Sequence, residues 1–219
     1  MNEVGERAAA ARILGFDILL KATAVTPGPD FSSIGAFNDA LETAILEHPT
    51  LSVDKSNRSL SNGRCTGDLC DSAATPSLLA LKQQILIAVA QYKMERPVDP
   101  AHPFLFGYPG NTEIFCWANV MDALGFHDVH FHPRSWLSGV YYPRIPEPEP
   151  DMGETSIAGW IEFGRAFHRF QSQDDPPVRL VRPHEGLMVL FPSYFGHRTI
   201  PLDSRKQRIS IAFDIVPVG

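Results

Sequence analysis

The sequence has few cysteines, no cluster of basic residues and no long apolar run. Its three cysteines, Cys65, Cys70 and Cys116, are an odd number without a CxxC pair, so neither a disulfide framework nor a structural zinc site is indicated, and we expect reduced thiols. The 19 basic and 25 acidic residues leave a formal net charge of −6, and no run of Lys and Arg could neutralise several phosphates, so nucleic acid is not an expected partner. The apolar run ILGFDILL is short and interrupted by Asp17, which fits neither a signal peptide nor a membrane span. These absences predict a cytoplasmic protein that does not bind membranes.

The chain has enough apolar residues to form one complete core. Its 219 residues are 44% hydrophobic, so a single domain is expected. Within the first hundred residues we expect a strand over 12–22, a helix capped by Ser32 or Ser33, and a second helix from Thr75 to about Met94. Both helices carry apolar residues at helical spacing, and a threonine followed by a proline is a typical helix start.

Between the two predicted helices, residues 55–74 are polar, rich in Gly and Ser and without an apolar period, which predicts a long surface loop.

Beyond residue 112 the pattern changes from helical to β-type. The segment 144–154, RIPEPEPDMGE, is compositionally biased, and within it residues 146–150 predict either an exposed, stiff loop or part of a substrate lid. Since the strands follow the helices without alternation, the simplest packing is an antiparallel barrel or sandwich with two helices on one sheet. The predicted strands are 112–121, 126–132, 136–143, 157–163, 178–182, 186–191 and 207–215.

Two histidines in HFHP lie two residues apart. If they belong to a strand, His130 and His132 project to the same side, and Asp128 joins them if the strand extends that far. Two neutral imidazoles on one face are suited to bind a metal. By itself the pair is equally compatible with ordinary surface or core histidines, so a third ligand is needed to decide.

A second group of polar residues lies near the C-terminus, where His197 follows the strand-like run GLMVLFP. Further on, the side chains of residues 208–215 alternate cleanly between two faces. If the apolar face packs on the helices, the other face is the barrel interior, and a guanidinium buried there needs an anion. The apolar set is Ile209, Ile211, Phe213 and Ile215, and the opposite set is Arg208, Ser210, Ala212 and Asp214.

Taken in order, the motifs HFHP, LSGVYY, WIEFG, LFPSYFGH and RISIAF resemble a bacterial group of the iron(II)- and 2-oxoglutarate-dependent oxygenases with prolyl-hydroxylase-like relatives. The resemblance extends from about residue 60, includes TGDL at 66–69, and implies a double-stranded β-helix, a jelly roll like that of the cupins. On this basis residues 1–219 form one domain, with a strand, supporting helices and a loop in 1–100 and the catalytic barrel in 101–219.

The resemblance also implies roles for individual residues. It implies iron(II) as the metal, 2-oxoglutarate as cosubstrate and dioxygen as oxidant, in an oxidoreductase that acts on a small molecule or a peptide. Arg208 would pair with a carboxylate of the cosubstrate, and Tyr142 and Ser210 would add hydrogen bonds. The metal ligands would be His130, His132 and His197.

One position departs from the superfamily pattern. The superfamily has a carboxylate ligand where this chain has His132, so the metal would have three histidine ligands unless Asp128 or Glu162 supplies an oxygen. Three neutral ligands leave the metal its full positive charge, which favours a dianionic cosubstrate.

A rival interpretation is a cupin-like metal-binding protein that is non-catalytic, or a dioxygenase or isomerase that does not use 2-oxoglutarate. In that case Arg208 would be an ion-pair partner of Asp214 or a surface charge. Among the aromatic residues, Trp117, Trp136 and Trp160 are expected in core or rim packing, with substrate contact as an alternative for Trp136 because it lies near the histidine pair in sequence. His127 has no partner pattern.

Overall fold

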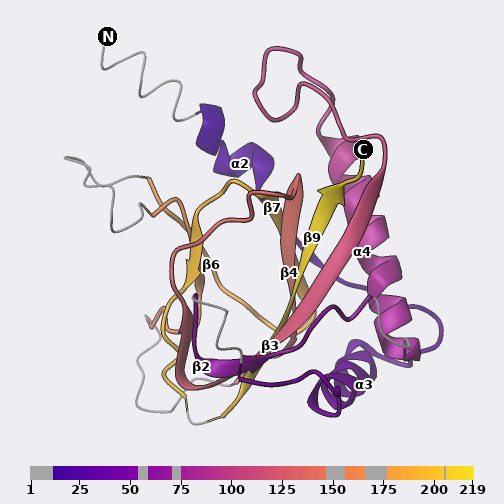
Figure 1. Cartoon of the computed structure of the whole chain (residues 1–219), viewed down its shortest axis with the longest axis vertical. Coiled ribbons are helices and arrows are strands. Elements are labelled where there is room, and N and C mark those ends of the chain that lie inside the picture. The colour runs from indigo at the N-terminus through magenta and orange to yellow at the C-terminus, as the bar shows by residue number, and fades with distance from the viewer. Residues whose placement is uncertain (1–11, 54–58, 71–74, 147–155, 166–176, 205) are drawn as a thin grey trace.

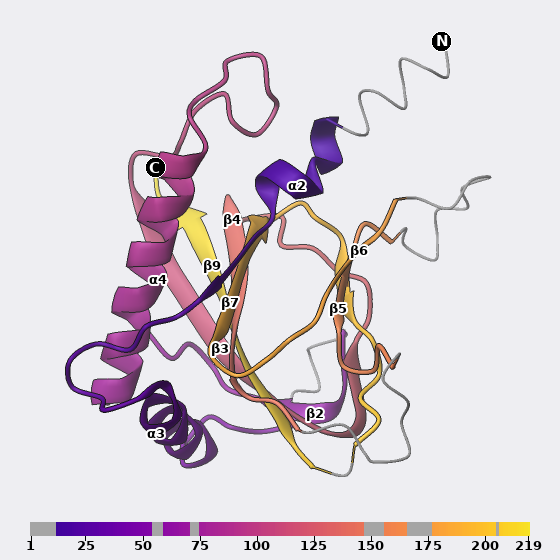
Figure 2. The same cartoon turned by 180° about the vertical axis from the view of Figure 1, so that it is seen from behind.

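Two antiparallel sheets face each other and enclose the interior of the molecule (Figure 1, Figure 2). The larger has six strands in the order β1-β7-β4-β9-β3-β2, and the smaller has three in the order β6-β5-β8. The computed structural model describes residues 12–53, 59–70, 75–146, 156–165, 177–204 and 206–219. In this part of the chain the elements are α2 (Phe16–Leu19), β1 (Lys21–Ala24), α3 (Ile34–Leu46), β2 (Leu60–Cys65), α4 (Pro76–Glu95), β3 (Thr112–His127), β4 (Leu137–Arg144), β5 (Ile161–Phe163), β6 (Arg179–Val181), β7 (Leu187–Pro192), β8 (His197–Thr199) and β9 (Arg208–Pro217).

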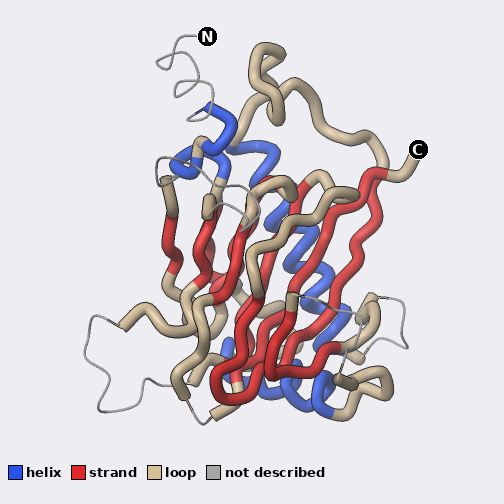
Figure 3. Tube along the Cα trace, turned by 60° about the vertical axis from the view of Figure 1, so that its left-hand side comes forward, coloured by secondary structure: helices blue, strands red, loops and turns tan. Residues whose placement is uncertain are grey.

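The helices α3 and α4 cover the outer face of the six-stranded sheet, and Figure 3 shows them (blue) behind the strands (red). Ser33 caps α3 by accepting a hydrogen bond from the backbone N–H of Ala36 at 3.1 Å, and Thr75 caps α4 through Leu78. Both predicted helices are therefore confirmed almost to the residue, as is their packing on one sheet. None of the described helices has the length and apolarity needed to cross a membrane.

The alternation predicted for the last strand is confirmed in β9. Ile209, Ile211 and Phe213 are fully buried in the core between sheet and helices, whereas Arg208 and Ser210 line a cavity on the other face. The neighbouring strand β3 has the same alternation, and its ten-residue antiparallel register with β9 aligns the two cavity-facing rows. The face away from the helices is thus the interior of the β-helix, as the sequence predicted.

Several local details differ from the predictions. The first strand was expected over 12–22, but most of this segment is helical and only 21–24 pair with β7, because the last residues of the run are the ones that reach the sheet edge. The predicted loop 55–74 contains β2, which pairs with β3 around a register shift despite its polar sequence. The described residues also include β8, a three-residue strand too short to be recognised by periodicity. Of the biased segment 144–154, residues 147–154 lie outside the described residues, and so the loop expected over 146–150 is described only at its first residue.

Candidate functional site

A cavity of about 190 Å³ lies between the two sheets. It collects the residues whose roles the motifs implied, from four separate parts of the chain. Two histidines reach it from the segment after β3, one from the start of β8, a tyrosine from β4, and an arginine with a serine from β9. These residues are His130, His132, His197, Tyr142, Arg208 and Ser210.

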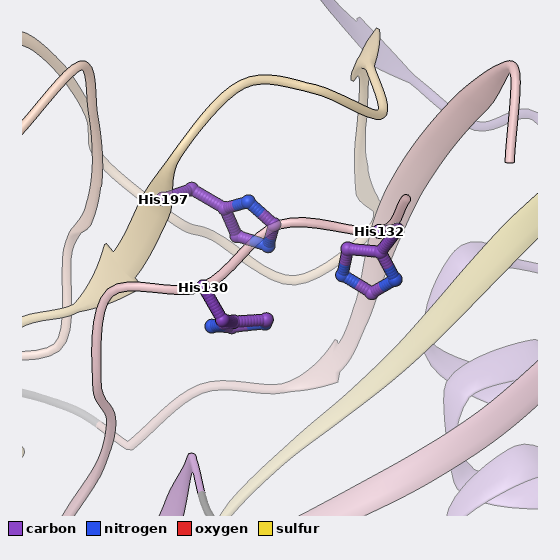
Figure 4. Close-up of side chains that lie close together, drawn as sticks. All are labelled: His130, His132 and His197. Atoms are coloured by element: carbon purple, nitrogen blue, oxygen red, sulfur yellow. The ribbon is translucent and has the colours of Figure 1, made fainter. Parts of the chain in front are cut away.

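The three imidazoles converge on one point, as Figure 4 shows. Their potential ligand atoms all lie within 4.8 Å of one another. His130 and His197 are held together by two backbone hydrogen bonds, of 3.0 and 2.9 Å, and their ring centroids are 4.3 Å apart. The backbone N–H of His132 donates to the carbonyl of Ser193 at 2.9 Å. The HxH pair is thus joined to the late histidine by an isolated bridge, and not by the regular strand that the sequence predicted.

Hydrogen bonds to backbone carbonyls orient two of the rings. Nδ1 of His130 donates to the carbonyl of Asp128 at 2.7 Å, and Nδ1 of His197 donates to that of Phe195 at 2.9 Å. Since a carbonyl can only accept, both Nδ1 atoms carry the proton and both Nε2 atoms keep a lone pair. Burial lowers the pKa of His130 to about 4 and that of His197 well below its usual range. Both rings are therefore neutral at pH 7, the state that a metal ligand requires.

The third ring is oriented by a carboxylate. Nδ1 of His132 donates to Oδ2 of Asp214 at 2.9 Å, and the hydroxyl of Ser138 donates to Oδ1 of the same carboxylate at 2.5 Å. Asp214 is only 8% exposed, so its negative charge acts on the imidazole with little screening. A carboxylate behind a histidine fixes its tautomer and raises its basicity as a ligand. The site therefore has a carboxylate next to the ligand set, although the ligand position itself holds His132.

Neither acidic residue considered as an oxygen ligand belongs to this group. The side chain of Asp128 is exposed, and the residue contributes its backbone carbonyl instead. Glu162 is bound by Arg165 and by Arg198, whose Nε donates to it at 2.8 Å. Among the described residues, the group that could hold a metal here consists of the three histidines alone.

Arg208 is buried in the cavity and has no counterion among the residues that the structure describes. It is 2% exposed, and its Nε and one terminal nitrogen have no hydrogen-bond partner among the described residues. Its guanidinium lies 5.1 Å from the centre of the Tyr142 ring, and the buried hydroxyl of Tyr142, whose nearest charged neighbour is this guanidinium, has no hydrogen bond of regular geometry within the described part of the chain. Burial lowers the pKa of Arg208 and raises that of Tyr142. A buried, unpaired cation with a free hydroxyl beside it is a site for an anion.

The sequence reasoning missed three residues of the cavity wall, Trp117, Asn119 and His127. Trp117 stacks on His132 with ring centroids 5.7 Å apart, and the ring of His127 lies 5.5 Å from that of His130. Alternation along β3 could have found the first two, because their neighbours Cys116 and Ala118 are buried on the helix side. His127 lies where β3 ends, and no periodic signal marks it.

Trp136 does not line the histidine cavity. It packs between Tyr92, Phe104 and Tyr108, and its ring stacks on that of Phe104 with centroids 5.7 Å apart. The possibility that it contacts a substrate beside the histidines is therefore not supported, because its ring points to the helix side of the sheet.

Comparisons with known proteins agree with this geometry. Residues 115–214 match the model of a family described as "Putative 2OG-Fe(II) oxygenase". This segment contains the three histidines, Arg208 and Asp214. A search of curated proteins finds no match. Over residues 115–214, the family match confirms a resemblance to the 2OG-Fe(II) oxygenases.

Solved structures share the fold at low sequence identity. A prolyl-4-hydroxylase from Pseudomonas putida is 17% identical with a TM-score of 0.60, covering 96% of this chain and 100% of its own. HygX from Streptomyces hygroscopicus, solved with nickel and 2-oxoglutarate, is 15% identical with a TM-score of 0.58, covering 94% and 86%. A prolyl hydroxylase from Trichoplax adhaerens, in complex with a peptide fragment of hypoxia inducible factor, is 12% identical with a TM-score of 0.56, covering 98% and 91%. The double-stranded β-helix fold is therefore confirmed.

Proposed function

We propose that this protein, which resembles the 2OG-Fe(II) oxygenases in sequence and in fold, is an iron(II)- and 2-oxoglutarate-dependent oxygenase that oxidises a C–H bond of its substrate. One observation carries the proposal: the buried, unpaired guanidinium of Arg208 shares a cavity with three converging imidazoles. A metal site alone does not need such an arginine. A site for a metal and a dicarboxylate needs both.

The donor groups of the cavity fit both the metal and the cosubstrate. Imidazole nitrogens suit iron(II), and because Nδ1 of His130, His132 and His197 is in each case bound to an oxygen, Nε2 is the atom of each ring that would bind the metal. When bound, the metal and the oxoacid supply oxidative decarboxylation to succinate and the oxidation of a substrate C–H bond with dioxygen, since three protein ligands leave the other coordination positions to these molecules.

The other polar residues bind and orient the cosubstrate. Arg208 can form a bidentate, charge-assisted pair with its distal carboxylate. The hydroxyl of Tyr142 stays protonated, because burial raises its pKa, and so it can donate a neutral hydrogen bond to the same group. Ser210 is 4% exposed and lines the cavity two residues after Arg208 on the same face of β9, and its hydroxyl can add another hydrogen bond to the cosubstrate. These contacts hold the oxoacid in one orientation relative to the histidines.

The charge of the site favours a dianion. Three histidine ligands would bring no negative charge to the metal, and Arg208 adds a positive charge in the same cavity. Asp214 offsets part of this charge from behind His132, through the imidazole and without direct contact with the metal. We infer that this arrangement substitutes for the carboxylate ligand that is usual in the superfamily.

The cupin-like alternative predicted that Arg208 pairs with Asp214 or lies on the surface. In either place the arginine would not need a bound anion to balance its charge. Instead, Asp214 is bound to His132 and Ser138, and Arg208 is buried. Both observations favour the oxygenase.

The test is an anaerobic titration. Iron(II)-loaded protein should develop a weak visible charge-transfer band when 2-oxoglutarate is added and should not do so with succinate, which lacks the keto group needed for chelation. In air, the same protein should convert 2-oxoglutarate to succinate and carbon dioxide, slowly without its substrate. If the band is absent at millimolar 2-oxoglutarate, the proposed oxygenase function is wrong and the cupin-like alternative takes its place.

Replacing Asp214 by asparagine should lower the affinity for iron(II) about 10- to 100-fold, the usual effect of removing a carboxylate behind a metal-bound histidine. Asparagine keeps the volume and one acceptor oxygen but loses the charge that strengthens the ligand. Competition with a coloured chelator measures the affinity. Asp17→Asn, which removes an exposed carboxylate near Arg179, is the control. Equal affinity in Asp214→Asn and wild type would contradict this role.

The substrate is expected to be a small molecule or a peptide. The Trichoplax adhaerens enzyme, similar in fold, was solved with a peptide fragment, which supports including peptides in a substrate screen. The cytoplasmic location stays a prediction from the sequence.

A further inference from the structure

Two of the three cysteines lie in contact on the far side of β3 from the histidine cavity. The Sγ atoms of Cys70 and Cys116 are 2.7 Å apart, although 46 residues separate them in sequence. Cys116 is 3% exposed and faces the core under the helices, because its neighbour Trp117 faces the cavity. Cys70 is half-buried and so can be reached by small molecules. The function proposed above uses neither sulfur.

Backbone hydrogen bonds hold both residues in this position. The N–H groups of Cys70 and Cys116 donate to the same oxygen of Asp68, at 2.9 and 3.0 Å. The N–H of Leu69 donates to the carbonyl of Cys116 at 2.7 Å, and that of Thr66 donates to Ala118 at 3.0 Å. The segment 66–70 is therefore attached along β3, and the sulfur–sulfur contact does not depend on a single flexible side chain.

The geometry suits a covalent link better than a metal. Asp68, Cys70 and Cys116 form a group of three potential ligands, whereas a structural zinc site uses four. Two thiolates on one tetrahedral zinc lie about 3.8 Å apart, given Zn–S bonds of about 2.3 Å. The observed 2.7 Å is shorter than that and closer to the bond of about 2.0 Å in a disulfide. The oxygen Oδ1 of Asp68 is moreover occupied by the two backbone donors.

The two thiols differ in the way that disulfide formation requires. The hydrogen bond from Cys116 lowers the pKa of Cys70, and this effect exceeds the opposite effect of burial. The same hydrogen bond and burial raise the pKa of Cys116. Cys70, which is the more accessible of the two and loses its proton more readily, is thus the cysteine that reacts first, and Cys116 is the thiol beside it.

We propose that Cys70 and Cys116 are a redox pair that forms a reversible disulfide when the protein meets a peroxide. The thiolate of Cys70 attacks one peroxide oxygen and becomes a sulfenic acid, and the other oxygen leaves as hydroxide, which takes up a proton to become water. The sulfur of Cys116 then attacks the sulfenic sulfur and forms the S–S bond, and its proton leaves with the hydroxyl group as a second water. Two thiols and hydrogen peroxide thus give one disulfide and two waters, and a dithiol reductant reverses the change.

The link would attach the segment between β2 and α4 covalently to the strand that carries Trp117. A transient disulfide of this kind agrees with the expectation of reduced thiols in a cytoplasmic protein, where disulfides are usually transient and redox-sensing. It does not depend on the identity of the metal or the cosubstrate.

The experiment is thiol counting on the full, metal-free chain, so that iron cannot react with the peroxide. Wild type treated with excess hydrogen peroxide should lose two of its three alkylatable thiols under denaturing conditions, and dithiothreitol should restore both. Peptide mapping without reductant should find the segments of Cys70 and Cys116 joined. Cys65→Ser, the control, should still form the link. Cys70→Ser should not form it, and circular dichroism checks that this variant, changed at a half-buried position, still folds.

Three results would overturn the proposal. The first is that wild type keeps all three thiols under peroxide. The second is that Cys70 accumulates as sulfinic or sulfonic acid without a link to Cys116. The third is that the purified protein binds zinc through this group, shown by a metal content that falls in Cys70→Ser while the histidines are intact.

Discussion

Arg208→Ala is expected to weaken the binding of 2-oxoglutarate to the iron-loaded protein by about one and a half to three and a half orders of magnitude. Deleting one partner of a buried guanidinium–carboxylate pair typically costs about 2–5 kcal/mol, which converts to that range of affinity. The affinity for iron should stay close to wild type, because the arginine is not a ligand and the three histidines remain. Isothermal titration of iron-loaded protein without oxygen measures the affinity for 2-oxoglutarate.

Two controls separate this effect from damage to the fold. Arg179→Ala removes a partly exposed arginine that is paired with Asp17 and does not line the cavity, and the variant should bind 2-oxoglutarate like wild type. Arg208→Ala should itself be at least as stable as wild type without cosubstrate, since it removes a buried charge that has no counterion. Tyr142→Phe should weaken binding in the same direction but by less, because a neutral hydrogen bond contributes only about 0.5–1.5 kcal/mol.

The outcomes of this titration discriminate between the two functions. If wild type and Arg208→Ala bind 2-oxoglutarate equally, the arginine does not hold the cosubstrate and the assignment of the anion site is wrong. If neither binds it at millimolar concentration, the cupin-like alternative takes the place of the oxygenase. A loss confined to Arg208→Ala and, to a smaller degree, Tyr142→Phe supports the proposed function.

Substitution of His130, His132 or His197 by alanine is expected to remove most of the bound iron, with a loss of affinity of at least about a hundredfold. The loss of a ligand must exceed the 10- to 100-fold effect of losing a residue that only orients one. Each of the three variants should behave alike, since the potential ligand atoms lie within 4.8 Å of one another and none has a substitute among the described residues. Metal content per chain after dialysis against a weak chelator, measured by mass spectrometry, gives the result.

His184→Ala is the matched control for these variants. This histidine is exposed, and its Nδ1 hydrogen-bonds the backbone of the next residue, so the variant should keep its iron. Thermal unfolding of the metal-free proteins should show that the alanine variants still fold, because their rings surround a cavity and do not fill the core. Unchanged iron content in all three variants would refute the metal site.

The two experiments are independent in their readout. In Arg208→Ala the affinity for the cosubstrate should fall while metal binding is kept. In the histidine variants metal binding should be lost, and with it any chelation of the cosubstrate by the metal. Loss of both in Arg208→Ala would indicate a general disturbance of the cavity, which the stability measurement would reveal.

The helices and the strand face of β9 could be predicted from the sequence because each rests on local information, whereas the roles of the candidate site residues were implied by the resemblance of the motifs to a known family. A Thr-Pro start and apolar spacing decide where α4 begins, and alternation decides that Arg208 and Ser210 face away from the helices. The order of the motifs further indicated that His197 belongs with the histidine pair. None of these inferences needed a distance between remote parts of the chain.

Tertiary structure alone decided how these residues meet. His130 and His197 are joined by an isolated bridge between an irregular segment and a three-residue strand, and neither has a periodic signal. The carboxylate of Asp214 was visible in the sequence only as a cavity-facing residue; its position behind His132, and therefore away from Arg208, depends on how β9 lies beside the segment after β3. The contact of Cys70 with Cys116 arises in the same way across 46 residues. Local propensity acts over a few neighbours, whereas pairing between distant segments is determined by the packing of the whole sheet, and so the sequence determined which residues were available and the fold decided which of them interact.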